Sequence, residues 1–167
     1  MRSGAPQIVP YFEEDTGITL YSVSWILCSN RLVAAGANTF NKGIIQVYSL
    51  TKELKKELVW ERENGIKAVT FKGSSLQDRF LAVGDLGGRI ESLDIEAKKE
   101  VWGLRGHEVV NCIDGAGGKG SGAYEILSGG REGCVKVWDT RIPNKPVVRD
   151  TWILQDIQIE ECKNESA

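Results

Sequence analysis

The sequence has few of the residues from which metal sites and catalytic centres are usually built. It contains one histidine, His107, and four cysteines at positions 28, 112, 134 and 162, with no Cys-x-x-Cys pair. Zinc sites need clustered ligands at short spacing, so the pattern predicts no metal site and no bound cofactor. Scattered thiols of this kind are typical of buried, reduced cysteines in a cytosolic protein.

Long apolar runs and a charge excess are also missing. No segment approaches the roughly 20 apolar residues that span a bilayer, and the N-terminal MRSGAPQIVPYFEEDTG lacks the apolar core of a signal peptide. The formal net charge of −2 favours neither nucleic acid nor an anionic membrane as a partner. Together these features predict a soluble, cytoplasmic, globular protein.

Glycine, by contrast, is abundant, with 19 residues against 4 prolines, and it reveals a repeat. The segments GIIQVYS, GRIESLD and GCVKVWD begin at Gly43, Gly88 and Gly133, which are spaced 45 residues apart (88 − 43 and 133 − 88). Two further apolar segments precede each of them, and a fourth follows after a charged turn. Four short strands within a fixed period in the forties, with Trp-Asp ending the third segment, are typical of a WD-repeat β-propeller blade.

The repeat predicts an all-β fold, a partial WD-repeat β-propeller of about three four-stranded blades. The blade units are predicted at 21–65, 66–106 and 107–152. Residues 1–20 form an N-terminal segment in which PQIVPYFEE is a candidate strand for ring closure, and 153–167 form a divergent acidic tail without a blade pattern. On this interpretation the chain is a truncated form whose open blade flanks promote association.

The third unit also carries the polar residues that hold a WD blade together. By the repeat pattern, His107, Ser128, Glu132 and Trp138 occupy the positions of a buried hydrogen-bond chain. Such a network stiffens a fold without performing chemistry, so the role predicted for all four residues is structural, and no catalytic residue is predicted. Because Glu132 stands where Asp is usual, we expect its longer side chain to leave the network imperfectly closed.

The first two units depart from this pattern. Tyr48 and Leu93 replace the tryptophan, and Lys42 and Gly87 replace the acidic residue. We therefore expect neither unit to form the hydrogen-bond chain.

A glycine-rich segment at 114–122 suggests a different function. Gly115, Gly117 and Gly120 have the G-x-G-x-x-G spacing that opens a dinucleotide-binding helix. The residues that follow predict strand, turn and strand instead of a helix, and the P-loop pattern fails because Ile113 stands where it requires glycine. A hairpin loop is the preferred interpretation, and a nucleotide-binding protein or enzyme that uses this loop is the alternative.

Four segments of the chain resemble one family of propellers. PQIV, SLQDRFLAVGDLGGRI, GHEVVNCIDGAGGKGSGAYEILSGGREGCVKVWD and RDTW look like the N-terminal part of the Monad family (WD repeat-containing protein 92, the axonemal dynein assembly factors). The resemblance covers roughly residues 6–152, and the glycine-rich insert between Gly-His and Trp-Asp is its most specific part.

The resemblance implies a propeller of seven blades, of which about three fit in this chain, and a non-enzymatic scaffold or adaptor. It implies work in the cytoplasm with a co-chaperone assembly of RuvB-like ATPases and prefoldin-like subunits, alongside heat-shock chaperones. Axonemal dynein chains are the implied clients, and a link to apoptosis is implied as well. No partner-contact residue carries over. A generic WD-repeat subunit of another complex is the remaining alternative.

Overall fold

The computed structural model describes residues 11–116, 124–142 and 146–148, the last three by their backbone. Within these ranges all regular structure is β-strand, and the strands form three antiparallel sheets of four strands each. The chain is therefore all-β with the architecture of a partial β-propeller, as the repeat predicted. No helix in the described ranges is long and apolar enough to cross a membrane.

Each sheet is a meander of four strands that follow one another in the chain. Blade one contains β1 (Thr19–Trp25), β2 (Arg31–Ala37), β3 (Gly43–Leu50) and β4 (Leu54–Arg62). Blade two contains β5 (Ile66–Thr70), β6 (Leu81–Asp85), β7 (Arg89–Asp94) and β8 (Lys99–Arg105). Blade three contains β9 (Val110–Gly115), β10 (Glu125–Gly130), β11 (Val135–Asp139) and β12 (Pro146–Val148).

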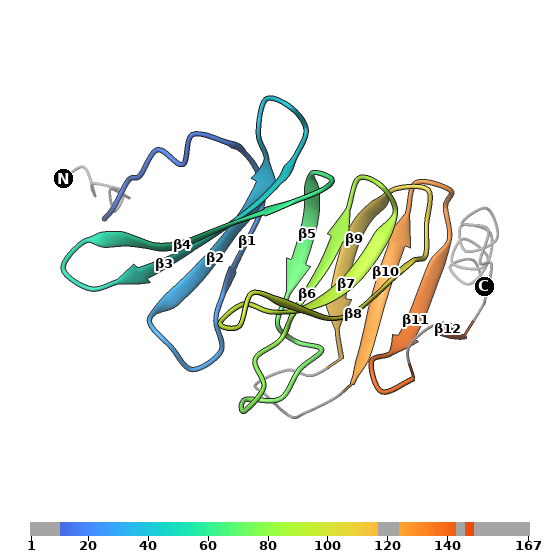
Figure 1. The fold of residues 1–167 in the computed structure, drawn as a ribbon. Coiled ribbons are helices and arrows are strands. Elements are labelled where there is room, and N and C mark those ends of the chain that lie inside the picture. Colours follow the sequence, from blue (N-terminus) through green and yellow to red (C-terminus); the bar gives the residue numbers. More distant parts are fainter. Residues whose placement is uncertain (1–10, 117–123, 143–145, 149–167) are drawn as a thin grey trace, which may run out of the picture.

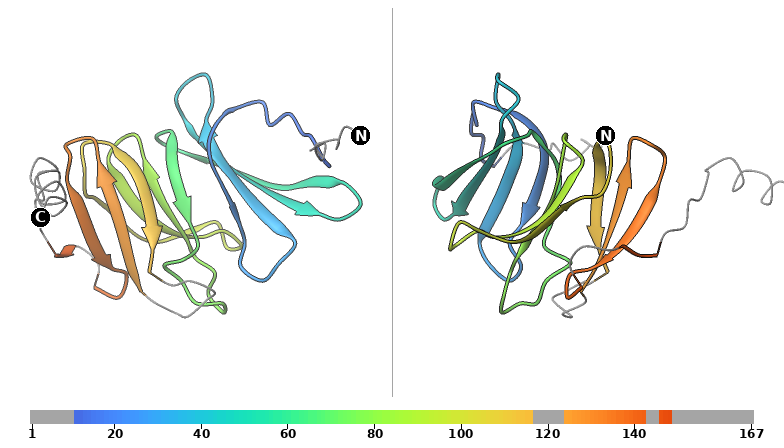
Figure 2. Two further views of the ribbon diagram at one scale, coloured as in Figure 1. Left: turned by 180° about the vertical axis from the view of Figure 1, so that it is seen from behind. Right: turned by 45° about the vertical axis from the view of Figure 1, so that its right-hand side comes forward.

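The three blades stand side by side, with their first strands adjacent. β5 packs against β1 and β2, and β9 packs against β5 and β6. Figure 1 shows the sheets as successive blades, and the turned views in Figure 2 show them as layers that face one another. The turns that join second to third strands therefore lie along one edge of all three blades, together with the loops that join one blade to the next.

Apolar side chains fill the space between neighbouring blades. Because successive residues of a strand point to opposite faces, β6 supplies side chains to two cores. Leu81 and Val83 face blade one, whereas Ala82 faces blade three. The first core also contains Val33, Ala35, Ile45, Val47, Ile66 and Leu93, and the second contains Ile90, Val110, Ile126 and Trp138.

The repeated glycine serves as a turn residue in blades two and three. Gly88 and Gly133 have φ of 81° and 76°, a conformation that costs glycine nothing and other residues strain. Their N–H groups donate to the carbonyls of Asp85 and Gly130, both at 3.2 Å. Each glycine thus closes a tight turn into the third strand.

Blade one has a longer turn in the same place. The N–H of Asn38 donates to the carbonyl of Lys42 at 3.0 Å, and Asn41 takes the left-handed φ of 61°. Gly43 pairs with Ala37 as the first residue of β3. The first glycine of the repeat therefore lies within a strand, because the extra turn residues precede it.

The prediction of buried cysteines is wrong for the described thiols. Cys28 and Cys112 are exposed and Cys134 is partly exposed, and all three are free. Cys28 lies in the β1–β2 turn at a φ of 52°, and Cys112 projects from β9 on the side away from blade two. Cys162, the tail at 153–167 and most of the candidate closing strand lie outside the described residues.

Candidate functional site

The structure brings together all four residues predicted for the polar chain of blade three. The indole N–H of Trp138 donates to Ser128 Oγ at 2.7 Å, and Ser128 Oγ lies 2.7 Å from His107 Nε2. A carboxylate only accepts hydrogen bonds, so Nδ1–H of His107 donates to Glu132, and Nε2 of the neutral imidazole then accepts from the Ser128 hydroxyl. Three of the four are buried, and Ser128 is fully enclosed. The structural role predicted for them remains a prediction that stability measurements can test.

Glu132 reaches His107 directly, in contrast to the imperfect closure that its length led us to expect. Its carboxylate contacts His107 Nδ1 and lies 3.4 Å from the amide nitrogen of Glu108 and 3.5 Å from Lys136 Nζ. Burial raises the pKa of Glu132, but hydrogen bonds from its own backbone, from His107 and from the Glu108 amide outweigh it and hold the pKa at about 2. The turn position lets the longer side chain fold back over the imidazole.

Blades one and two replace this chain by other contacts. In the sheet register, Ser128 faces Lys136, and the matching pairs are Val83 with Glu91 and Ala34 with Gln46. Blade two is therefore apolar where blade three has its serine. In blade one, the Tyr48 hydroxyl donates to Gln46 Oε1 at 2.7 Å in a buried setting.

These pairs reveal a repeated polar position on the third strand that the sequence reasoning missed. Gln46, Glu91 and Lys136 are spaced 45 residues apart. Each side chain contacts a residue of the chain that comes before the first strand of its own blade. Gln46 Nε2 donates to the Thr16 carbonyl at 3.0 Å, Glu91 pairs with Arg62, and Lys136 Nζ donates to the Gly106 carbonyl. The sequence signal for this position was a polar residue between apolar ones in IIQVY, RIESL and CVKVW. It was missed because an amide, a carboxylate and an amine are chemically different and do not form a recognisable repeat.

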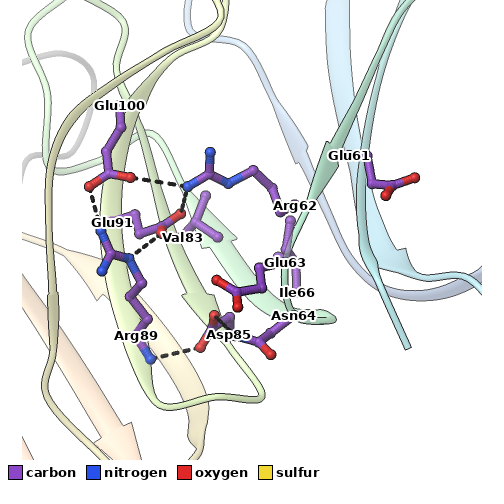
Figure 3. Close-up of a pocket in the computed structure, with 10 residues that line it drawn as sticks. All are labelled: Glu61, Arg62, Glu63, Asn64, Ile66, Val83, Asp85, Arg89, Glu91 and Glu100. Carbon is purple, nitrogen blue, oxygen red and sulfur yellow. Dashed lines mark hydrogen bonds and ion pairs between the residues drawn. The ribbon is translucent and has the colours of Figure 1, made fainter. Parts of the chain in front are cut away.

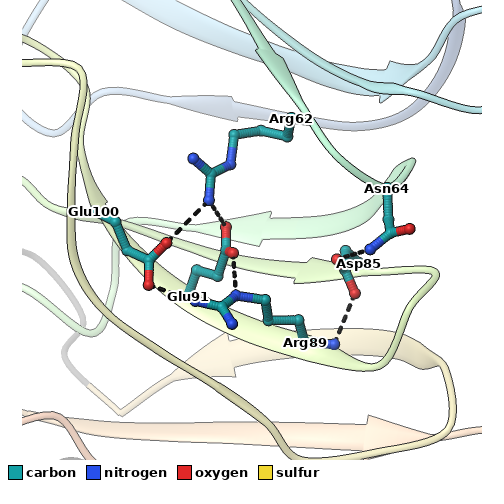
Figure 4. A network of polar contacts seen from close by, with 6 residues as sticks. All are labelled: Arg62, Asn64, Asp85, Arg89, Glu91 and Glu100. Carbon is teal, nitrogen blue, oxygen red and sulfur yellow. Dashed lines mark hydrogen bonds and ion pairs between the residues drawn. The ribbon is translucent and has the colours of Figure 1, made fainter.

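At the junction of blades one and two, this position is the centre of a charge network. Arg62 from the end of β4 lies 2.7 Å from Glu91 and 3.2 Å from Glu100, and Arg89 contacts the same two carboxylates. Figure 4 shows the four side chains as a ring of alternating charge. The Glu91 side chain is only 7% exposed, and a carboxylate so buried needs its charge compensated.

The charge network shifts the pKa of Arg89, and further hydrogen bonds connect the network to the β6–β7 turn. Burial lowers the pKa of Arg89, but Glu91 and Glu100 outweigh it and raise the pKa above its usual value. Asp85 accepts bonds from Asn64 Nδ2 at 3.1 Å and from the Arg89 amide at 2.7 Å. The β4–β5 loop is thereby tied to the β6–β7 turn.

These side chains line a pocket of about 340 Å³ between the two blades (Figure 3). Its lining is Glu61, Arg62, Glu63, Asn64, Ile66, Val83, Asp85, Arg89, Glu91 and Glu100. Glu63 points into the pocket beside Asp85, whereas Glu61 points away. The lining holds no histidine and no serine, threonine or cysteine nucleophile, and both arginines are paired with carboxylates. Among the described residues, no group of three His, Cys, Asp or Glu side chains is placed to hold a metal ion.

The flanks of the glycine-rich segment are strands. β9 ends at Gly115 and pairs antiparallel with β10, in which Ile126 faces Gly115. Residues 117–123, including Gly117 and Gly120, lie outside the described residues. A dinucleotide fingerprint requires a helix after its glycines, and the described residues that follow enter β10 instead.

Known proteins resemble the chain over most of its length. No protein-family model matches it. A protein named dynein axonemal assembly factor 10 from Xenopus laevis is 42% identical over 147 residues, which are 85% of this chain and 41% of the relative. The proteins of that name from Homo sapiens and Chlamydomonas reinhardtii are 40% and 38% identical, over 85% and 88% of this chain and 41% and 45% of their own lengths.

The match covers only part of each relative. The chain spans about two fifths of the length of the curated relatives it matches. What the whole relatives do is therefore a property of a longer protein. Over most of its residues, this chain is a homologue of proteins named dynein axonemal assembly factor 10.

Proposed function

We propose that the chain is a non-enzymatic WD-repeat scaffold that takes part in the assembly of axonemal dynein in the cytoplasm. In this proposal it links a co-chaperone assembly of RuvB-like ATPases and prefoldin-like subunits to dynein chains as clients. Residues 21–65, 66–106 and 107–152 are its three blade units. The observation that carries the proposal is the 38–42% identity to proteins named dynein axonemal assembly factor 10.

The geometry of the described residues supports a scaffold. The polar groups at the blade junctions bond to one another: His107 lies between Ser128 and Glu132, and Arg62 lies between Glu91 and Glu100. Groups engaged in this way stabilise the sheets and leave loops and turns to contact partners.

Affinity purification of the tagged full chain from ciliated cells, followed by mass spectrometry, tests the proposal. We expect axonemal dynein chains and RuvB-like ATPases to co-purify with the wild-type chain. Trp138→Ala removes a side chain from the second core and should lose them, whereas Val59→Ser, on the outer strand β4, should keep them. Recovery of neither class of protein with the wild-type chain would contradict the proposal.

The nucleotide-binding alternative has its own test. Titration of the chain with labelled ATP or NAD should show no saturable binding. Micromolar binding that Gly117→Val abolishes would favour the glycine-rich loop as a functional site.

A further inference from the structure

Phe40 projects from the β2–β3 turn of blade one and is 84% exposed. Single exposed apolar residues are common on protein surfaces, so the exposure alone indicates little. Three further observations concern the turn that carries Phe40: its backbone is fixed by hydrogen bonds, it is longer than the corresponding turns of the other two blades, and a pocket lies next to it.

The turn that carries Phe40 is held by the side chain of Asn38. Asn38 Oδ1 accepts hydrogen bonds from the N–H groups of Phe40 at 2.9 Å and Lys42 at 3.0 Å. The Asn41 N–H donates to the Asn38 carbonyl at 3.0 Å. Because the backbone at Phe40 is already fixed, contact with a partner orders little more than one side chain, and the entropic cost of binding is small.

The corresponding turns of blades two and three are folded back. The Leu86 amide donates to the Gly65 carbonyl at 2.8 Å, and the Arg131 amide donates to the Val109 carbonyl at 3.0 Å. In Figure 1 the β2–β3 turn rises above these shorter turns along the upper edge of the blades. Among the described residues of these three turns, Phe40 in blade one is the only large aromatic side chain.

A negatively charged pocket lies next to this turn. Ala37 and Asn41 of the turn adjoin Gly65, and the neighbours of Gly65 in the chain, Asn64 and Ile66, line the pocket of the charge network. Without Glu61, which points away (Figure 3), the lining contains four carboxylates and two guanidinium groups, and both arginines are paired with Glu91 and Glu100. Glu63 is exposed and points into the pocket, and no described residue bonds to its carboxylate.

We propose that Phe40 and the mouth of this pocket form one docking surface for a basic peptide segment of a partner protein. Phe40 packs against an apolar side chain of the segment, and a lysine or arginine of the segment enters beside Glu63. Rigid aromatic residues are enriched among the side chains that dominate interface energies, and complementary charge sets the orientation of the partner. This inference rests on the proposed scaffold function and adds the surface and the chemistry of the partner.

Selection of short random peptides displayed on phage, with the immobilised full chain as bait, provides the probe. We expect the enriched peptides to combine aromatic or aliphatic residues with lysine or arginine. Fluorescence anisotropy should then show that Phe40→Ser and Glu63→Lys each weaken the binding of these peptides by at least about tenfold. Val59→Ser, which changes an apolar residue that is 47% exposed on β4, should leave the affinity unchanged. Circular dichroism checks that all three variants are folded.

Three results would overturn the docking surface: no enriched peptide, enriched peptides that are acidic, or equal binding to Phe40→Ser and the wild-type chain. Each is distinguishable from failure of the scaffold proposal. If the wild-type and Phe40→Ser chains both recover dynein chains from cells to the same extent, the scaffold function stands and this surface does not carry it.

Discussion

Ser128→Ala tests the hydrogen-bond chain of blade three with the smallest change in packing. Ser128 is fully buried, and its Oγ is the bonding partner of both the Trp138 indole and His107 Nε2. Replacing the hydroxyl by hydrogen removes one atom and leaves no cavity of consequence. What remains is two ring nitrogens that face a methyl group.

The size of the effect follows from those two orphaned groups. A buried polar group that loses its partner costs about 1–3 kcal/mol. His107 is 5% exposed and Trp138 is 3% exposed, so water cannot replace the lost bonds without opening the blade. Two such groups are orphaned, so we expect Ser128→Ala to lower the free energy of unfolding by about 2–6 kcal/mol, a large share of the 5–15 kcal/mol that is typical of a domain.

Urea unfolding followed by far-ultraviolet circular dichroism measures this loss. A matched control is Ser92→Ala on β7, because Ser92 is 4% exposed but none of the described residues bonds to its hydroxyl. The control should change stability by less than about 1 kcal/mol. If Ser128→Ala is as benign as Ser92→Ala, with an unchanged denaturant slope, the hydrogen-bond chain does not stabilise the blade and the reasoning fails.

Three further predictions concern other parts of the fold. The pKa of Glu132 is held at about 2, below its usual 4.5, so the stabilisation from its carboxylate is complete above about pH 5 and is lost as the pH falls towards 2. Acid should therefore destabilise the wild-type chain more than Glu132→Gln. Parallel curves of stability against pH for the two proteins would refute this. Arg62→Met should lower the free energy of unfolding by about 1–3 kcal/mol, since it leaves buried Glu91 with one partner. Arg141→Met should lower it by less than about 1 kcal/mol, because the arginine of that pair is 58% exposed. Equal losses in urea unfolding would contradict a stabilising role of the charge network. Ile126→Ala should lower the free energy of unfolding by about 2–5 kcal/mol, whereas Leu127→Ala should change it little, because Leu127 is 46% exposed on the other face of β10. If the open flank of blade three drives self-association, Leu127→Lys should reduce it in light scattering.

The sequence by itself determined the β-strand content and its division into blades. A spacing of 45 residues between Gly43, Gly88 and Gly133, with alternating apolar residues on either side, predicted three sets of four strands, and the sheets follow that plan. This information is local. Alternation over five to nine residues and a turn between strands are properties of a hairpin, and each hairpin carries them whatever lies beside it.

The residues of the third blade could also be found from the sequence, because His107, Ser128, Glu132 and Trp138 lie at positions that the repeat itself marks. The side chains that tie one blade to the next could not be found in this way. Arg62 and Glu91 are 29 residues apart in different sheets, and nothing in RIESL indicates that its glutamate is buried against an arginine of the preceding blade.

Only the tertiary structure decided which polar groups meet. Whether a side chain faces water or the next sheet depends on how the sheets twist and stack, and local alternation does not encode that packing. The same reason explains the exposure of Cys112 and the contact of Glu132 with His107. In each case the position of the backbone came from the repeat, and the environment came from a neighbour far away in the chain.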